Sequence, residues 1–372
     1  MNKIFTAIRQ YFKNTDKVLL AICFTTCIFG SLMIWSCTNY FFGTNRYFFV
    51  QILASVLGLI SAMVISLLDY RMLAKLWKLH VPLCVFLVLL TFFIGLQREG
   101  ADDKAWLQLP GGLTLQPSEL LKISFILSFS LHLETVKDDI NSLKNVVYLC
   151  VHGAIPVLLI HFQGDDGTAL VFFVIFLAMI FAAGLSWKYI LSGFGVMAAA
   201  APVFWFFIFS PEQQLRIKSL FNPDLDPLGI GYQPILGRIS IGAGQLFGQG
   251  FDGPHQKIPA IQNDFLFAYI GETLGFVGCI SVLAIISTLC MRILKTSKLS
   301  RDPLGTYICV GVFTTFAFQS IVNIGMCLSL LPVIGVTLPL FSYGGTSVIT
   351  MFIGIGLVLS VYMNNKRSYF EE

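Results

Sequence analysis

The sequence predicts an all-α protein that crosses a membrane about ten times. Its mean hydropathy is +0.79, and 56% of its 372 residues are apolar while only 12% are charged. A soluble protein carries about 25% charged residues. Apolar runs of roughly 17–25 residues, which suffice to cross about 30 Å of hydrocarbon, recur along the chain. These observations predict a single polytopic membrane domain over residues 1–372.

The expected membrane spans follow from the positions of these apolar runs. Two of them, at 117–133 and 146–162, are short and carry polar residues, so we expect both inside the bundle instead of against lipid. The ten predicted spans lie near residues 18–37, 48–68, 79–97, 117–133, 146–162, 167–184, 188–209, 265–291, 305–329 and 345–363.

The positions of Lys and Arg predict the orientation of the chain, because cytoplasmic connections carry an excess of these residues. If the N-terminus is cytoplasmic, nearly all the clustered Lys and Arg residues of the short connections fall on the cytoplasmic side. Both termini are then cytoplasmic, and a large extracytoplasmic loop at about 210–264 joins the seventh and eighth helices. Most polar motifs fall on the outer side, and polar loops that converge on one face usually build a site.

The first polar motif is QPSELLK, which opens the fourth predicted span. Glu119 and Lys122 are three residues apart and share a helix face. One interpretation is a capping box with a local ion pair. The other is that Lys122 reaches across the bundle to Asp165 in the Gly-flanked turn QGDDGTAL, because ionisable groups inside a membrane generally pair. We expect a structural role for such a pair.

The long outer loop contains NPDLDPLGIGYQ and IGAGQLFGQGFDG, which are rich in turn-forming residues. Its glycines allow the backbone to approach a ligand closely, and their N–H groups can form an anion-binding nest. GAGQLFGQG is not a P-loop, because it lacks the GK[ST] ending. Arg216, Arg238 and Lys257 add positive charge suited to phosphate; the alternative for each is a solvated or headgroup-binding cation.

Two carboxylates mark the start of the eighth span in NDFLFAYIGETLG. Asp264 is expected at the outer helix end, where it can be an N-cap, a catalytic group, or both. Glu272 lies two turns further in and about 80° around the helix. We expect Glu272 to bond a neighbouring helix.

The ninth span and the segment after it carry further polar side chains. Gln319 and Asn323 share one helix face, and amides in a membrane helix usually bond other helices. Ser342 lies in LPLFSYGGTS, which enters the last span. The nine cysteines show no CxxC or metal-ligand spacing. A net charge of only +4 does not suggest nucleic acid as a partner.

These motifs, in this order, resemble the RodA/FtsW (SEDS) family. The resemblance rests on GADDKAWLQLPGGLTLQPSELLK, QGDDGTALVF, RIKSLFNPDLDPLGIGY, NDFLFAYIGETLGFVG, FQSIVNIGM and LPVIGVTLPLFSYGGTS, and runs from about residue 16 to 364. It implies a peptidoglycan glycosyltransferase that polymerises lipid II at the outer face of the bacterial cytoplasmic (inner) membrane. It also implies a class B penicillin-binding protein as the transpeptidase partner, within the elongation or division machinery.

The resemblance assigns roles to individual residues. Asp264 matches the family's essential aspartate, and is the expected general base or the ligand of a divalent cation, Mg²⁺ or Mn²⁺. Trp106 matches a family tryptophan, and Asp165 matches the acidic residue of the QPDLGTA motif. We list Trp106, Arg216, Arg238, Lys257, Gln319 and Ser342 as candidates for binding the pyrophosphate or glycan. Glu119, Lys122, Asp165, Glu272 and Asn323 are expected to be structural polar residues.

Some residues depart from the family pattern. Ala260 stands where the family has an acid before the aspartate, and Gln262 replaces a histidine. Gln249 replaces a lysine in the glycine-rich stretch. The chemistry is therefore expected to rest on Asp264 alone.

Two other functions fit parts of the sequence. A lipid II flippase or transporter would also have many spans with buried charge, but the polar sequence here is one-sided, and matching interrupted helices in two halves are absent. A non-catalytic scaffold for the transpeptidase would explain the lost acid. The short terminal segments and LPVIGVTLPL favour a RodA-like over an FtsW-like member.

Overall fold

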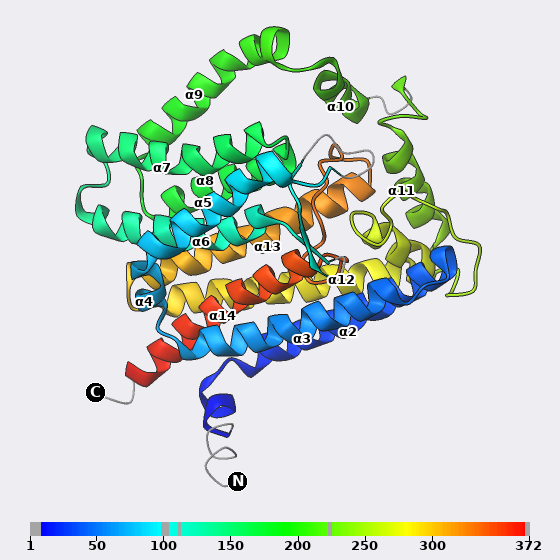
Figure 1. Ribbon diagram of the computed structural model, residues 1–372, viewed down its shortest axis with the longest axis horizontal. Helices are drawn as coiled ribbons and strands as arrows, with labels where there is room; N and C mark the ends of the chain where they lie inside the picture. The colour runs from blue at the N-terminus through cyan, green and yellow to red at the C-terminus, as the bar shows by residue number, and fades with distance from the viewer. Residues whose placement is uncertain (1–8, 98–103, 111–112, 222–224, 369–372) are drawn as a thin grey trace.

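The computed structural model describes residues 9–97, 104–110, 113–221 and 225–368. The described part consists of long helices and one hairpin (Figure 1). The hairpin pairs β1 (Leu107–Leu109) with antiparallel β2 (Leu113–Leu115). The helices are α2 (Lys17–Phe42), α3 (Arg46–Leu67), α4 (Tyr70–Lys75), α5 (Trp77–Ile94), α6 (Pro117–Thr135), η2 (Lys137–Asp139), α7 (Leu143–Phe162), α8 (Asp166–Ala182), α9 (Trp187–Val203), η3 (Phe204–Ile208), α10 (Pro211–Phe221), α11 (Tyr232–Ala243), α12 (Leu266–Leu299), α13 (Pro303–Cys327) and α14 (Gly345–Ser368).

Each predicted span overlaps one of these helices. In the described part of the chain, 8 helices are long and apolar enough to cross a membrane. The two other predicted spans correspond to α8, which is apolar but has 17 residues, and α6, which carries Glu119 and Lys122. The all-α, multi-pass fold is therefore confirmed, while the count of ten crossings stays a prediction.

The two short polar spans differ in burial. Most of α6 is buried, as predicted. The prediction for α7 is wrong, because only one of its faces packs against the bundle, through residues such as Leu149, Gly153 and Pro156. Its other face exposes large apolar side chains, among them Val147, Val151 and Leu158. In a membrane protein such a face lies against lipid. The polar residues of α7 are therefore not a sign that the whole helix is enclosed by protein.

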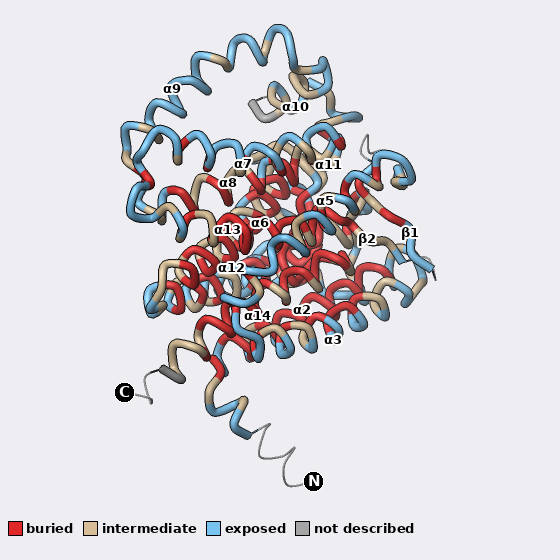
Figure 2. The backbone as a smooth tube through the Cα atoms, turned by 60° about the vertical axis from the view of Figure 1, so that its left-hand side comes forward, coloured by how far each residue is buried: buried red, intermediate tan, exposed pale blue. Residues whose placement is uncertain are grey.

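The centre of the bundle is formed by α13 and α14, whose apolar windows are 67% and 83% buried. Small residues let α14 lie close along α3: a Cβ on Gly356 would come within 2.9 Å of the Ala62 Cα, and one on Gly58 would collide with the Phe352 ring. Close approach of small residues is a common way for membrane helices to associate. Figure 2 shows this buried centre in red.

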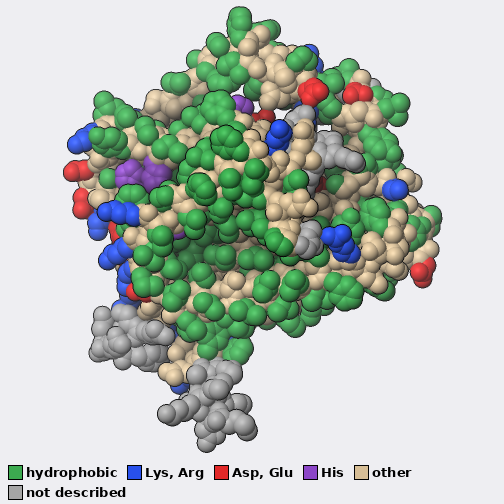
Figure 3. Space-filling view, in the orientation of Figure 1, with side chains coloured by type: hydrophobic (Ala, Val, Ile, Leu, Met, Phe, Trp, Pro, Cys, Tyr) green, Lys and Arg blue, Asp and Glu red, His purple; other side chains and the backbone are tan. Residues whose placement is uncertain are grey.

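The bundle has two chemically different ends. The start of α2 and the end of α14 lie on the same side of the molecule (Figure 1), and Lys and Arg side chains gather there (Figure 3). We call this the basic end; it includes Lys17, Arg71, Lys75, Lys78, Arg292 and Lys298. We call the opposite end, with residues 104–110, 113–116, 163–165, 225–265 and 328–344, the loop end. The distribution of charge agrees with the predicted orientation, in which the basic end is cytoplasmic.

The segment from α9 to α10 stands apart from the bundle (Figures 1 and 2). None of the described residues in α9 or η3 is buried, although this stretch is apolar enough to span a membrane. The region predicted as a long outer loop begins with α10 and continues to α11, so it is partly helical. Of these helices, α11 packs against α12 at the loop end.

Candidate functional site

Asp264 lies just before α12, at the loop end. The helix begins at Leu266 and its N-cap is Phe265. Asp264 is therefore one residue outside the predicted cap position, and the interpretation of Asp264 as the N-cap is wrong. Its backbone N–H donates to the Ala260 carbonyl at 3.0 Å, which closes a turn. Ala260 itself has a positive φ of 55°.

A side chain from α13 fixes the backbone at Asp264. The fully buried Asn323 donates from Nδ2 to the Asp264 carbonyl and to the Val336 carbonyl, both at 2.8 Å. One amide thereby joins the segment before α12 to the segment after α13. The sequence predicted hydrogen bonds from Asn323 to other helices; the structure shows bonds to the backbone of two loop segments instead. Gln319, one turn earlier on α13, is also buried, and its Oε1 has no hydrogen-bond partner among the described residues.

Further hydrogen bonds join the other loops of this end. The Tyr343 N–H donates to the Gln262 carbonyl at 2.9 Å, so the turn before α14 lies against the segment that carries Asp264. Buried Ser342 accepts from the Leu338 N–H at 3.0 Å, and its carbonyl accepts from Gln51 Nε2 on α3. Ser342 thus shapes its own turn. The polar motifs of the sequence do converge on one end of the bundle.

The turn before α8 is joined to α6 by an amide. Asp165 caps α8 by accepting the Thr168 N–H at 2.9 Å, and its other oxygen accepts from Gln116 Nε2 at 3.0 Å. Trp106 is half-buried at the start of the hairpin, and its carbonyl accepts the Leu96 N–H at 2.7 Å. These contacts anchor two of the predicted site residues to neighbouring helix ends.

Lys122 pairs with a residue of its own helix. Its Nζ lies 2.7 Å from Glu119 Oε1, and both side chains are buried. Glu119 Oε2 accepts from Thr350 Oγ1 on α14 at 3.0 Å. Of the two interpretations of QPSELLK, the local ion pair is correct, and no ion pair joins Lys122 to Asp165 among the described residues. The buried Glu119–Lys122 pair thus joins α6 to α14 through Thr350, which fits the structural role expected for these residues.

Glu272 bonds the segment before its own helix. Its Oε1 accepts the Gln256 N–H at 3.0 Å, and Oε2 lies 3.5 Å from His255 Nδ1. Both side chains are fully enclosed, and the His255 ring packs edge-on against Tyr40 and Tyr269. Ser240 on α11 also interacts with this carboxyl group, so the expected contact with a neighbouring helix is present beside the bonds to the loop segment. The sequence analysis missed His255, because no spacing rule links a loop histidine to a carboxylate 17 residues later.

The glycine-rich stretch packs against α12 and not around a ligand cavity. Gly275 breaks α12 with φ 68° and ψ −158°. The backbone of the loop bonds to the turn around this break, with Gln249 N–H donating to the Glu272 carbonyl at 2.9 Å and Phe276 N–H to the Gln245 carbonyl at 2.8 Å. A Cβ on Gly244 would collide with the Gly271 carbonyl. The glycines are thus explained by contact between two backbones, which corrects the anion-nest prediction.

The three candidate cations lie on three separate segments, and all are exposed. Arg238 is on α11, next to Gly237, which packs against the Phe265 ring beside Asp264. Lys257 is seven residues before Asp264 in the same segment. Arg216 is on α10, which stands off from the bundle in Figure 1. Arg238 and Lys257 therefore lie on elements that adjoin Asp264, whereas the structure does not bring Arg216 to it.

Asp166 was not assigned a site role from the sequence, but the structure gives its carboxylate two contacts. Asp166 accepts from His161 Nδ1 at 2.6 Å and from Gln213 Nε2 at 2.8 Å. Gln213 belongs to α10, so this carboxylate ties the start of α10 to the start of α8.

The described residues contain no group of three or more His, Cys, Asp or Glu side chains arranged to hold a metal ion. Asp264 can supply one carboxylate. Mg²⁺ commonly binds through one or two carboxylates together with substrate phosphates. The donor set therefore fits an ion shared with a phosphorylated substrate, and it does not fit an ion enclosed by protein alone.

Comparison with known proteins gives consistent matches over nearly the whole chain. A protein named peptidoglycan glycosyltransferase MrdB, from Escherichia coli (strain K12), is 32% identical over 359 residues, which is 95% of each chain. Stage V sporulation protein E of Bacillus subtilis (strain 168) is 32% identical over 371 residues, or 94% of this chain and 97% of the relative.

Solved structures agree in fold. A chain from a structure of a peptidoglycan synthase complex, described as coordinating polymerization and crosslinking, has a TM-score of 0.82 and 27% identity over 94% of this chain and 98% of its own. The rod shape determining protein RodA of Thermus thermophilus has a TM-score of 0.70 and 26% identity over 94% and 97%. The model of the FtsW/RodA/SpoVE family, described as cell cycle protein, matches residues 16–367. The chain therefore belongs to the FtsW/RodA/SpoVE family.

Proposed function

We propose that this protein is a peptidoglycan glycosyltransferase that polymerises lipid II into glycan strands at the outer face of a bacterial cytoplasmic membrane. The observation that carries the proposal is the hydrogen bond from buried Asn323 to the Asp264 carbonyl, which fixes the family's aspartate at the loop end of the bundle. Relatives named peptidoglycan glycosyltransferase support the reaction type. A rod-shape protein among the similar structures fits a RodA-like role in elongation, and relatives named FtsW fit division.

The reaction joins two sugars and releases a lipid pyrophosphate. The 4-hydroxyl of an acceptor GlcNAc attacks the anomeric carbon of MurNAc in the donor. A new glycosidic bond forms, the bond to the pyrophosphate oxygen breaks, and undecaprenyl pyrophosphate leaves with the electron pair. The Asp264 carboxylate accepts the hydroxyl proton as a general base, which contributes about 10²–10⁴ in rate.

Other residues of the loop end bind and orient the substrate in this proposal. Arg238 and Lys257, exposed on segments beside Asp264, offer positive charge to the pyrophosphate. Trp106, half-buried at the start of the hairpin, offers a ring face to a sugar. A divalent cation, Mg²⁺ or Mn²⁺, would be held by Asp264 together with the pyrophosphate and would neutralise charge on the leaving group. In that case Asp264 acts as a ligand.

The partner is a class B penicillin-binding protein that crosslinks the new strands. The similar chain from a peptidoglycan synthase complex supports a crosslinking partner in general. The described residues of α9 are all at least partly exposed, and its apolar side chains offer a surface to a partner within the bilayer.

Purified protein and labelled lipid II test this proposal. We expect long glycan strands on a gel, from the protein alone or after addition of its transpeptidase. In proteoliposomes, movement of lipid II across the bilayer without any polymer would contradict the proposal and favour a transporter. No polymer even with the partner present would favour a scaffold.

A further inference from the structure

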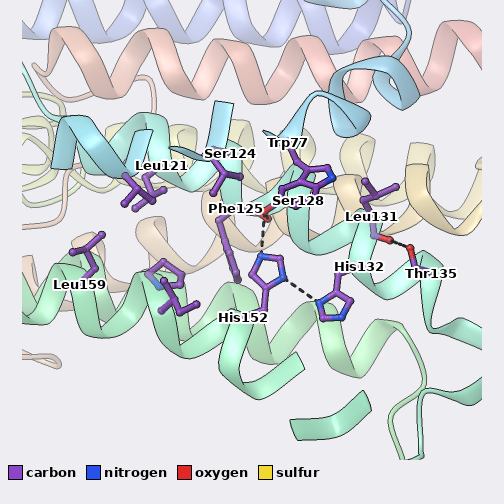
Figure 4. Close-up of a pocket in the computed structure, with 14 residues that line it drawn as sticks. Trp77, Leu121, Ser124, Phe125, Ser128, Leu131, His132, Thr135, His152 and Leu159 are labelled. Atoms are coloured by element: carbon purple, nitrogen blue, oxygen red, sulfur yellow. Dashed lines mark hydrogen bonds between the residues drawn. The ribbon is translucent and has the colours of Figure 1, made fainter. Parts of the chain in front are cut away.

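A cavity of about 430 Å³ lies between α5, α6 and α7, away from Asp264 (Figure 4). Its walls are mainly apolar, with Leu121, Phe125 and Leu159 on α6 and α7. Polar atoms enter it from Ser128, His132 and His152. Ligand cavities of about 300–1,000 Å³ typically combine apolar walls with a few such polar groups.

The two histidines form a connected polar group inside the cavity. His132 Nδ1 lies 3.1 Å from His152 Nδ1, and His152 Nε2 lies 3.3 Å from Ser128 Oγ (Figure 4). These contacts use both nitrogens of His152 but only one of His132. Among the described residues, His132 Nε2 has no hydrogen-bond partner. Polar side chains within a membrane are costly and are a reason to look for a ligand.

The cavity extends from the basic end past the middle of the bundle. Along α6 its lining runs from Thr135, the last residue of the helix, to Leu121. At 1.5 Å per residue this is about 21 Å, compared with about 15 Å for half of the hydrocarbon core. Trp77, the first residue of α5, lines the same end. Tryptophan is enriched at the level of lipid headgroups.

The faces of the helices around the cavity are open to lipid. Ile155 lines the cavity and is also exposed, as are its neighbours Val151 and Leu158 on α7. Leu83 and Phe86 on α5 are exposed too. Since this is a multi-pass membrane protein, the medium that adjoins the opening is the hydrocarbon of the bilayer.

Positive charge lies at the headgroup end of the cavity. Exposed Lys78 has its Nζ 5.8 Å from the centre of the Trp77 ring, so it sits beside a residue of the lining. On α7, exposed Lys144 lies two turns before His152 and contacts the Tyr148 ring. Basic pockets between membrane helices on the cytoplasmic side suit the headgroups of anionic lipids.

We propose that this cavity binds one anionic phospholipid from the leaflet at the basic end. One acyl chain fills the space between Leu121, Phe125 and Leu159. The ester carbonyl at the top of the chain accepts a hydrogen bond from His132 Nε2, and the phosphate lies by Lys78. The site is separate from the Asp264 site and does not depend on the proposed reaction.

Photocrosslinking tests the proposal with the full-length protein in mixed detergent–lipid micelles. The probe is phosphatidylglycerol with a diazirine in the acyl chain, and mass spectrometry locates the labelled peptides. We expect labelling concentrated on residues 117–135 and 143–162, and competition by unlabelled phosphatidylglycerol but much less by phosphatidylcholine. Labelling spread evenly over all lipid-facing helices would overturn the site, and equal competition by the two lipids would overturn the headgroup assignment.

Matched variants sharpen the test. Ser128→Phe fills the cavity and should abolish the concentrated labelling, whereas Ser281→Phe, at an exposed position on α12, should leave it unchanged. Lys78→Gln should weaken competition by phosphatidylglycerol about fivefold, as expected for one cation near a membrane surface. Lys295→Gln, also exposed at the basic end, is its control. Labelling of Ser128→Phe at the wild-type level would contradict the proposal. If that variant does not fold, the competition between phosphatidylglycerol and phosphatidylcholine on the wild-type protein tests the proposal instead.

Discussion

Asp264 owes its position to one amide on another helix. Asn323 is fully buried and donates to the Asp264 and Val336 carbonyls. The sequence places Asp264 near a helix start and Asn323 on a polar face of α13, but it does not reveal that they meet. Contacts between a helix and a returning loop depend on tertiary packing, which no local spacing rule describes.

Asn323→Ala should slow polymerisation, because the segment that carries Asp264 loses its anchor. A misplacement of about 1 Å can cost about 10²-fold in rate. Initial rates over a range of lipid II concentrations should show a lower kcat with a smaller change in KM. Asn323→Gln keeps the donor and should recover part of the loss. Asn145→Ala is the control, because half-buried Asn145 also donates from Nδ2 to a backbone carbonyl, that of Asp139 near the basic end. An unchanged kcat would show that the anchor has no role in catalysis.

Lys122→Met should destabilise the protein strongly, since it leaves the buried Glu119 carboxylate without its cation. Breaking a buried pair in this way costs about 3–5 kcal/mol. The double variant Glu119→Gln/Lys122→Met removes both charges and should unfold at a higher temperature than the single variant. Thermal unfolding in detergent measures both, and a double variant no more stable than the single one would argue against the pair.

At the scale of elements, the positions of the membrane spans were predictable from the sequence. What each span and loop packs against was only partly predictable. Hydropathy located the long apolar helices, because a bilayer requires long apolar runs whose backbone bonds are satisfied internally; it did not locate α4, α10 or α11. It did not show that one face of α7 is exposed, because lipid and a protein interior are both apolar. The glycine-rich stretch was also misinterpreted: glycine permits close backbone approach, but the sequence does not say whether to a ligand or to α12.

Gly275→Ala should test the contact between this stretch and α12. Gly275 has φ 68° and ψ −158°, and a Cβ there would collide with the Gly248 N–H. Such a backbone conformation costs a residue other than glycine about 1–3 kcal/mol, before any collision. We expect a clearly lower unfolding temperature. Gly193→Ala, in open space on α9, should leave the unfolding temperature equal or higher, and similar effects of the two changes would contradict the account.

At the scale of the whole molecule, two ion pairs close the basic end. Arg292 on α12 pairs with Asp16 before α2 at 2.6 Å, and Arg71 on α4 pairs with Asp302 before α13 at 2.7 Å. The two contacts tie the start of α2 to α12 and the start of α13 to α4. The sequence predicted that cations gather here, but it did not identify their partners.

The Asp302 contacts predict a dependence of stability on pH. Burial raises the pKa of Asp302, but hydrogen bonds from the Gly305 N–H, Arg71 and Tyr70 outweigh it and hold the pKa below its usual value. A lowered folded-state pKa stabilises the protein above the unfolded pKa of about 3.9, and this contribution is lost as the pH falls through the folded-state value. Asp302→Asn should therefore lower the unfolding temperature at pH 7, and the difference from wild type should shrink below about pH 4. A difference that grows on acidification would contradict this sign.

The central claim is that the carboxylate of Asp264 does the chemistry of the loop end. Asp264→Asn keeps the size of the side chain and removes the base or ligand, and Asp252→Asn, an exposed aspartate in the same outer segment, is the matched control. Polymerisation of lipid II should fall by at least about 10²-fold in Asp264→Asn, with lipid II binding and unfolding temperature retained, and should be unchanged in Asp252→Asn. Polymerisation by Asp264→Asn at the wild-type rate would contradict the account.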